Sequence, residues 1–103
     1  MTNKEMLELA AKAAGLNVQD LDDNGGFVNG VHWNPLDDDE TAMQLVAKLK
    51  LNVEWFDMNI NGVDDSYVVV KGSKIINKFG RDFSGKAHEY RHAIVLAAAS
   101  MGM

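Results

Sequence analysis

Hydrophobic residues recur at helical spacing near the start of the chain. Between residues 2 and 14, apolar side chains fall every three or four positions, which is the pattern of one buried helix face. Thr2 and Glu5 have the spacing of a capping box, and Gly15 follows where a helix end favours a left-handed residue. The sequence therefore predicts a first helix from Thr2 to Ala14.

A second helix is predicted after Asp37. Asp37 and Glu40 repeat the capping pattern, and the acidic run 37–40 suits the positive end of a helix dipole. An acidic run can also bind a metal ion or a partner, but capping explains this one without either. The apolar positions expected to face the core are Ala42, Leu45, Val46 and Leu49.

The stretch between these helices, residues 16–36, has no clear periodicity. It contains three glycines and the only proline of the chain, Pro35. Alternation allows one short strand within residues 27–33. We otherwise expect a long loop, and loops of this length often carry function.

Three strands are predicted after the second helix. Residues 51–55 alternate between apolar and polar, residues 67–70 are apolar on both faces, and residues 75–79 alternate again. The middle segment fits a central strand that is covered on both sides. Asn61-Gly62 is a turn signal, although residues 63–65 lengthen the predicted connection beyond two residues. Connections this short require an antiparallel meander.

The last predicted helix runs from about Gly85 to Met101, with Ser84 as its cap. It is apolar nearly all round, and a chain of 103 residues has little material with which to bury a whole helix. We therefore expect a contact between copies of the chain, in a homo-oligomer. The predicted fold is one α+β domain over residues 1–103, with a three- to four-stranded antiparallel meander layered between helices, an α/β/α sandwich of order α-α-β-β-β-α.

Composition narrows the possible functions. A hydrophobic content of 47% excludes wholesale disorder. The net charge is −5 and the basic residues are dispersed, so the composition argues against nucleic-acid binding. The absence of cysteine excludes disulfides and thiolate chemistry. No apolar run approaches the roughly 20 residues of a membrane span, and the N-terminus is acidic where a signal peptide would be apolar. We expect no membrane association and a cytoplasmic location.

One segment has the formal pattern of a zinc peptidase motif. His88, Glu89 and His92 form H-E-x-x-H, in which two histidines on one helix face chelate zinc and the glutamate activates water. A catalytic zinc needs a third protein ligand, and His32 is the only histidine left to supply it. A zinc hydrolase is therefore a remote alternative, and we expect two polar residues near the exposed start of a helix.

A second segment matches the first half of a calcium-binding loop. Asp20, Asp22 and Asn24 alternate before Gly25, as in an EF-hand, but the twelfth position is Val31 where a bidentate glutamate is needed. Asx turns explain the same cluster without an ion.

The loop residues His32, Trp33 and Asn34 are the most unusual cluster. A tryptophan beside polar side chains can form a recognition patch, or it can attach the loop to the core, and large aromatic side chains are usually well buried. We favour attachment to the core. Beyond the zinc pattern, the chain has no nucleophile–base order, phosphate-binding glycine loop or nucleotide fingerprint, so we expect no cofactor and no catalysis.

Residues 31–101 resemble small proteins of tailed phages and prophages. The similarity lies in Trp33-Asn34-Pro35-Leu36 followed by acids and a helix, and in the closing run from Arg91 to Ala99. These are the phage ABA-sandwich proteins, of which the NinX-like group is a relative. The resemblance implies a sheet layered between helices and an accessory role inside the infected cell, with no catalytic residues to transfer.

These patterns together predict a non-catalytic accessory protein that binds a host or phage macromolecule, for example in counter-defence. The expected contact surface joins the 32–34 cluster to the neighbouring acids. The alternative is a protein that sequesters a small ligand such as a nucleotide signal, in a pocket between subunits that uses Tyr90 for stacking and Arg91 for charge. The candidate binding residues are His32, Trp33, Asn34, Asp37, Asp38, Tyr90 and Arg91, with His88 and His92 as weak metal candidates.

Overall fold

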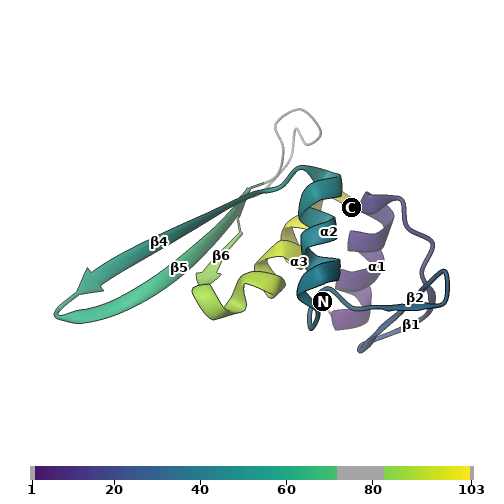
Figure 1. Cartoon of the computed structure of the whole chain (residues 1–103), viewed down its shortest axis with the longest axis horizontal. Helices are drawn as coiled ribbons and strands as arrows, with labels where there is room; N and C mark the ends of the chain where they lie inside the picture. The colour runs from purple at the N-terminus through teal and green to yellow at the C-terminus, as the bar shows by residue number, and fades with distance from the viewer. Residues whose placement is uncertain (1, 72–82, 103) are drawn as a thin grey trace.

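The computed structural model describes residues 2–71 and 83–102. These residues form three α-helices, one 3₁₀ turn and two three-stranded antiparallel sheets, so the predicted α+β class is confirmed. The order α-α-β-β-β-α is that of the larger elements, and a small additional sheet lies between the first two helices. The molecule measures 47 × 28 × 23 Å, and it is elongated because a β-hairpin projects beyond the helices (Figure 1).

Helix α1 (Asn3–Ala14) begins and ends as predicted. The Thr2 hydroxyl accepts a hydrogen bond from the Glu5 amide at 3.1 Å. Gly15 ends the helix with φ 68°, and its amide donates to the Lys12 carbonyl. The buried face of α1 consists of Met6, Leu7, Ala10, Ala11 and Ala14.

The predicted loop over residues 16–36 is wrong, because three short strands occupy most of it. They are β1 (Gln19–Asp22), β2 (Gly25–Val28) and β3 (Val31–Trp33), paired in that order. The single strand predicted within 27–33 is divided by a turn at Asn29 and Gly30, both with positive φ. Strands of three or four residues are too short to establish a period of two in the sequence.

Helix α2 (Asp39–Leu49) starts one residue later than predicted. Its cap is Asp38, whose carboxylate accepts hydrogen bonds from the amides of Glu40 and Thr41 at 3.4 and 3.3 Å. Asp37 instead belongs to the preceding turn, in which its amide donates to the Asn34 carbonyl at 3.1 Å. The helix ends at Leu49, and the residue after it, Lys50, is the C-cap and has left-handed backbone angles.

The larger sheet contains β4 (Asn52–Ile60), β5 (Val63–Lys71) and β6 (Phe83–Lys86), in the order β4-β5-β6. The predicted central position of residues 67–70 is confirmed. The longer connection predicted after Asn61-Gly62 is wrong, because these two residues alone make the turn, with φ values of 54° and 80°. The third strand predicted at 75–79 lies outside the described residues.

The start of the last predicted helix is also wrong. Residues 83–86 pair with β5 as β6, a 3₁₀ turn η1 (Ala87–Glu89) follows, and α3 (Tyr90–Gly102) begins five residues after the predicted start. Sheet pairing outside the segment therefore decides the conformation of Gly85, which lies opposite Val68. Such tertiary contacts routinely override local helix propensity.

Helix α3 is the centre of the core. It packs against α1, α2, β5 and β6, and seven of its residues are buried. The contact with α1 is close, since a Cβ atom at Gly102 would collide with the Leu9 carbonyl oxygen. Burial within one chain therefore accounts for a helix that is apolar all round. The homo-oligomer stays a prediction, but this helix no longer supplies the reason for it.

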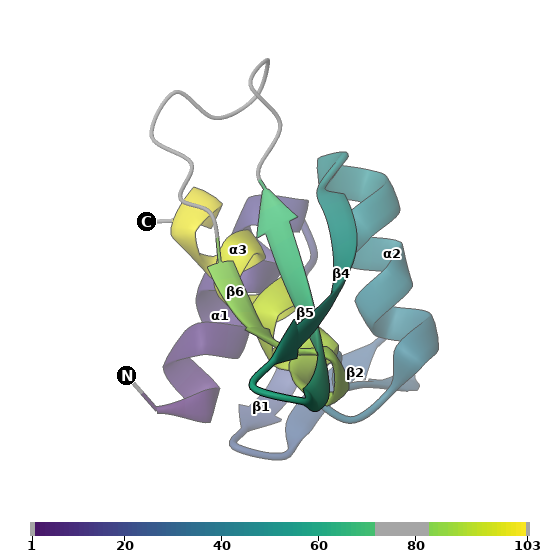
Figure 2. The same ribbon diagram turned by 90° about the vertical axis from the view of Figure 1, so that its left-hand side faces the viewer.

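The helices stand behind the larger sheet when the molecule is viewed from the hairpin side (Figure 2). Val68 and Val70 of β5 are fully buried on the face that meets α3. No helix in the described part of the chain is both long and apolar enough to span a membrane.

Candidate functional site

The far half of the β4–β5 hairpin extends away from the rest of the fold (Figure 1). Nine residue pairs join the two strands, which corresponds to a length of about 30 Å. Strand β6 pairs only with residues 67–70 of β5, so the hairpin beyond them projects from the helices as a two-stranded ribbon (Figure 1). Both edges of this ribbon are free within the residues that the structure describes.

Among the side chains of this hairpin that the structure describes, three large apolar ones are exposed. Trp55 is 55% exposed, Phe56 46% and Val63 65%. The pairing register puts Phe56 and Val63 on one face and Trp55 on the other, where its ring lies 5.7 Å from that of Tyr90. We call these three residues the hairpin patch. Exposed aromatic side chains are typical of protein-binding surfaces.

Acidic side chains surround the hairpin patch and stiffen the ribbon. Asp57 accepts a hydrogen bond from the Ser66 hydroxyl, and Asp64 accepts one from the Asn59 amide, each at 2.7 Å. Both donors are neutral side chains. Asp65 differs, because an ion pair with Lys86 at 2.9 Å lowers the pKa of its carboxyl group. The end of the hairpin therefore combines apolar and anionic groups.

Tyr90 and Arg91, the residues predicted to bind a nucleotide, have a partner within the chain. Both donate to the Asp39 carboxylate at the start of α2, and the Arg91–Asp39 ion pair measures 2.6 Å. The Arg91 guanidinium also stacks 5.1 Å from the centre of the Tyr90 ring. The hydrogen bonds from Tyr90 and Arg91 lower the pKa of Asp39. A nucleotide would have to displace Asp39 to use these two side chains.

The predicted contact surface at residues 32–38 is only partly exposed. Trp33 is 3% exposed and Asn34 8%, whereas His32, Asp37 and Asp38 are exposed. Asn34 holds the loop by donating to the Asn24 carbonyl and accepting from the Leu36 amide, each at 3.1 Å. Trp33 and Asn34 therefore attach the loop to the core, which agrees with the favoured interpretation and corrects their assignment to a contact surface.

His88 and His92 do not lie on one α-helix. His88 lies in the 3₁₀ turn and His92 in the first turn of α3, both exposed, so the predicted helical H-E-x-x-H register is wrong. Glu89 accepts a hydrogen bond from the Lys86 amide at 3.3 Å, which is a capping contact. Among the described residues, no three histidine, aspartate or glutamate side chains are grouped to hold a metal ion.

The calcium-like segment is a turn between two strands. The Asp22 carboxylate accepts from the Asn24 amide at 2.7 Å, which is the Asx turn expected as the alternative to an ion site. Asp23 accepts from the Lys4 amide at 2.8 Å and so satisfies a free donor in the first turn of α1.

Sequence reasoning missed the hairpin patch. The sequence predicts a half-buried strand over residues 51–55, but β4 continues to Ile60 and Trp55 is exposed. The Asn61-Gly62 dipeptide is the signal that could have found it. Two-residue turns of this kind join strands in direct register, which extends both strands up to the turn.

Comparison of the chain with protein-family models, curated proteins and solved structures found no match. The resemblance to phage ABA-sandwich proteins therefore stays a prediction.

Proposed function

We propose that this protein is a binding module that recognises another protein through the hairpin patch. The observation that carries the proposal is the exposure of Trp55 and Phe56 at the base of the projecting ribbon, and of Val63 next to its turn. Exposed large apolar groups have a cost in solubility and in aggregation, and a partner that covers them accounts for their presence. Tryptophan and tyrosine are also the residues most often responsible for binding energy at interfaces.

Backbone geometry supports a protein partner. Strand β4 is an edge strand of nine residues within the described sheet, and its free amides and carbonyls can pair with a strand of another chain. The acids Asp57 and Asp64 favour a partner with basic residues next to its apolar contact. They disfavour nucleic acid, which is bound chiefly through cations that neutralise phosphates.

The setting that we propose follows the phage resemblance. In that setting the protein acts in the cytoplasm of an infected bacterium and binds a host or phage protein as an accessory factor, for instance against a defence system. The α+β layering of the fold is compatible with the resemblance and supports it only at the level of fold. The proposed binding surface does not depend on this setting.

Site-specific photo-crosslinking tests the proposal. A photoreactive amino acid at Val63 should crosslink to one partner in host cells, whereas the same group at Met43 should not, because Met43 is similarly apolar and 43% exposed but lies on α2. With the purified partner, Phe56→Ala should weaken binding at least about ten-fold, as expected for a central aromatic contact. Met43→Ala is the matched control.

Two results would change the proposal. Equal affinity of the Phe56→Ala variant and the unmodified protein for the partner would contradict it. The other result is a crosslink between two copies of this chain, together with a dimer mass in sedimentation. It would mean that the partner is a second copy of the chain, paired along β4. That second outcome would support the predicted homo-oligomer, with the contact on β4 and not on the last helix.

A further inference from the structure

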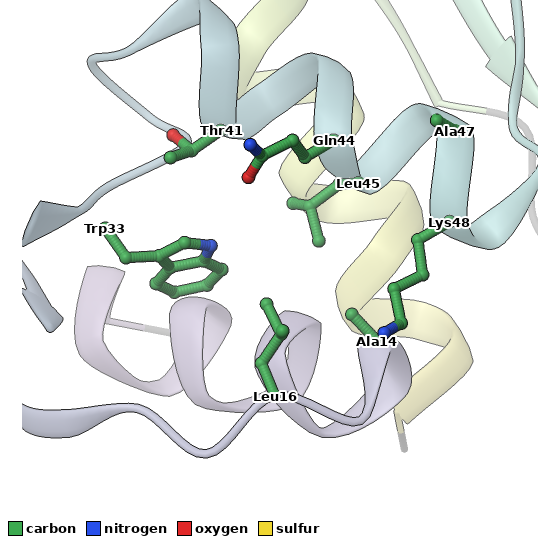
Figure 3. Close-up of a pocket in the computed structure, with 8 residues that line it drawn as sticks. All are labelled: Ala14, Leu16, Trp33, Thr41, Gln44, Leu45, Ala47 and Lys48. Carbon is green, nitrogen blue, oxygen red and sulfur yellow. The ribbon is translucent and has the colours of Figure 1, made fainter. Parts of the chain in front are cut away.

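A pocket lies between the end of α1, strand β3 and helix α2 (Figure 3). No residue of the β4–β5 hairpin is among its lining residues. Its volume is about 550 Å³, within the range of small-molecule sites. Its walls are mostly apolar, and its polar groups are the Trp33 indole N–H from β3 and three side chains from α2. The lining residues are Ala14, Leu16, Trp33, Thr41, Gln44, Leu45, Ala47 and Lys48.

One buried donor in this pocket has no partner. The indole Nε1 of Trp33 makes no hydrogen bond with any described residue, although Trp33 is 3% exposed. Figure 3 shows this nitrogen on the side of the ring that faces Gln44 and Leu45, towards the space between the elements. Buried donors in folded proteins nearly always have an acceptor, so this N–H is available to an oxygen atom of a bound molecule.

One cation borders the same space. Lys48 lies one helical turn after Gln44 on α2, so both residues share a face of the helix. Its side chain extends from α2 towards Ala14 in Figure 3. The ion pairs among the described residues do not include Lys48, and the lining contains no acidic residue. An adjoining hollow contains Asp38 and Glu40, so an anionic group fits only at the Lys48 end.

We propose that this pocket binds a small carboxylate that has an apolar body and a carbonyl group. The apolar body would lie between Leu16 and Leu45, and the carbonyl oxygen would accept the hydrogen bond from Trp33 Nε1. The carboxylate would lie at the Lys48 end of the pocket. The site shares no residue with the hairpin patch, so the two proposals stand or fall separately.

N-octanoylglycine is a suitable probe because it combines an acyl chain, an amide carbonyl and a carboxylate. In a Trp55→Phe background, Trp33 is the only remaining tryptophan, since the chain contains two. Binding of the probe should therefore change the wavelength and intensity of the remaining fluorescence. Calorimetry then compares its affinity with those of its methyl ester, which lacks the charge, and of decanoate, which lacks the amide.

Four variants separate the expected contacts. Lys48→Met should weaken binding of the acid about three-fold and leave binding of the ester unchanged. Lys12→Met, an equal charge change outside the pocket, should leave binding of both unchanged. Trp33→Phe should weaken both acyl-glycines about five-fold and leave decanoate unchanged. Ala47→Phe should abolish binding of all three, because it fills the pocket from an exposed position on α2.

Circular dichroism and thermal melting confirm that each variant is folded before its affinity is compared. The proposal is overturned if N-octanoylglycine does not bind at millimolar concentration. It is also overturned if Ala47→Phe binds the probe as well as the unmodified protein, or if Lys12→Met weakens binding as much as Lys48→Met. In each of those cases any fluorescence change reflects non-specific association.

Discussion

The helical core and the β4–β5 hairpin use the same kinds of apolar residue in opposite ways. In the core, Ile94 and Leu7 are fully buried, and alanines and Gly102 allow α1 and α3 to approach closely. On the hairpin, residues as large as Trp55 and Phe56 are about half exposed. The two tryptophans show the contrast directly, since Trp33 is 3% exposed and Trp55 is 55% exposed.

This difference identifies which apolar residues need an explanation beyond folding. Burial stabilises the fold in proportion to the apolar area removed from water, so the core residues are explained by folding alone. The far half of the hairpin contributes little such area. Its shape depends on the Asn61-Gly62 turn and on cross-strand pairs such as Asp57–Ser66. A two-stranded ribbon with so little support is only marginally stable by itself. Folding alone therefore explains neither the ribbon nor the exposed aromatics at its base, Trp55 and Phe56, which point to a role in binding.

The largest expected effect separates the two regions by stability. Ile94→Ala removes a fully buried side chain from α3 and should lower the free energy of unfolding by about 2–5 kcal/mol. Val63→Ala changes a side chain that is 65% exposed and should alter it by less than about 0.5 kcal/mol. Urea denaturation followed by circular dichroism measures both. Similar losses in the two variants would mean that the hairpin belongs to the core.

A smaller effect is expected at the glycines of the first sheet. Gly25 has φ 98°, and a Cβ there would lie 2.6 Å from the Cβ of Asn34, so Gly25→Ala combines backbone strain with a collision. We expect a loss of about 2–3 kcal/mol in unfolding free energy. Gly30 is the matched control, with φ 79° and open space around it. Gly30→Ala should cost only the strain, about 1 kcal/mol.

Equal losses of unfolding free energy in Gly25→Ala and Gly30→Ala would show that the segment of Trp33 and Asn34 moves to accommodate a methyl group at residue 25. The loop would then be less firmly attached to the core than the hydrogen bonds of Asn34 indicate. In that case the contrast between a rigid body and a weakly supported ribbon would be weaker than we infer. Thermal unfolding of both variants under the same conditions makes this comparison.

A third comparison tests which acidic residue caps helix α2. Asp38→Ala removes the side chain that accepts from two amides, and should cost about 1 kcal/mol of unfolding free energy. Asp37→Ala removes the same charge one residue earlier, where the side chain does not cap α2, and should cost less than about 0.5 kcal/mol. If the order of the two losses is reversed, the start of α2 predicted from the sequence is the better description.

How well each element could be predicted depends on its length and on its distant contacts. Helix α1 was predicted to the residue at its C-terminal end because Thr2, Glu5 and Gly15 act locally. The start of α3 was placed five residues early, because pairing with β5 keeps Gly85 and Lys86 extended. No local pattern contains that information.

The candidate sites show the same limit. The burial of Trp33 follows from a general preference of large aromatics, and it was favoured from the sequence. The partnership of Asp39 with Tyr90 and Arg91 joins residues about 50 positions apart, and a single sequence does not reveal it. The exposure of Trp55 is missed for a similar reason, since its neighbour Tyr90, the first residue of α3, lies 35 positions later in the chain.

The smallest expected effect concerns the junction between the two regions. Tyr90 contacts Trp55 of the hairpin and donates to Asp39 of α2, and that hydrogen bond is the main cause of the lowered pKa of Asp39. Tyr90→Phe should therefore raise the pKa of Asp39 towards its ordinary value of 3.8. Carbon-detected nuclear magnetic resonance of the Asp39 carboxyl group measures this change directly.

The sign of the effect on stability follows from the direction of the shift. A carboxyl group whose pKa is lower in the folded state stabilises the fold above its unfolded pKa, and this contribution is lost as the pH falls through the folded value. Asp39→Asn should therefore reduce the loss of stability between pH 5 and pH 2, and Tyr90→Phe should reduce it in part. The change should be small, because the Asp39 side chain is 63% exposed and solvent screens its charge. Tyr90→Phe could leave the loss of stability between pH 5 and pH 2 unchanged while Asp39→Asn alters it. In that case Arg91 alone stabilises the Asp39 carboxylate, and the hairpin is not coupled to α2 through Tyr90.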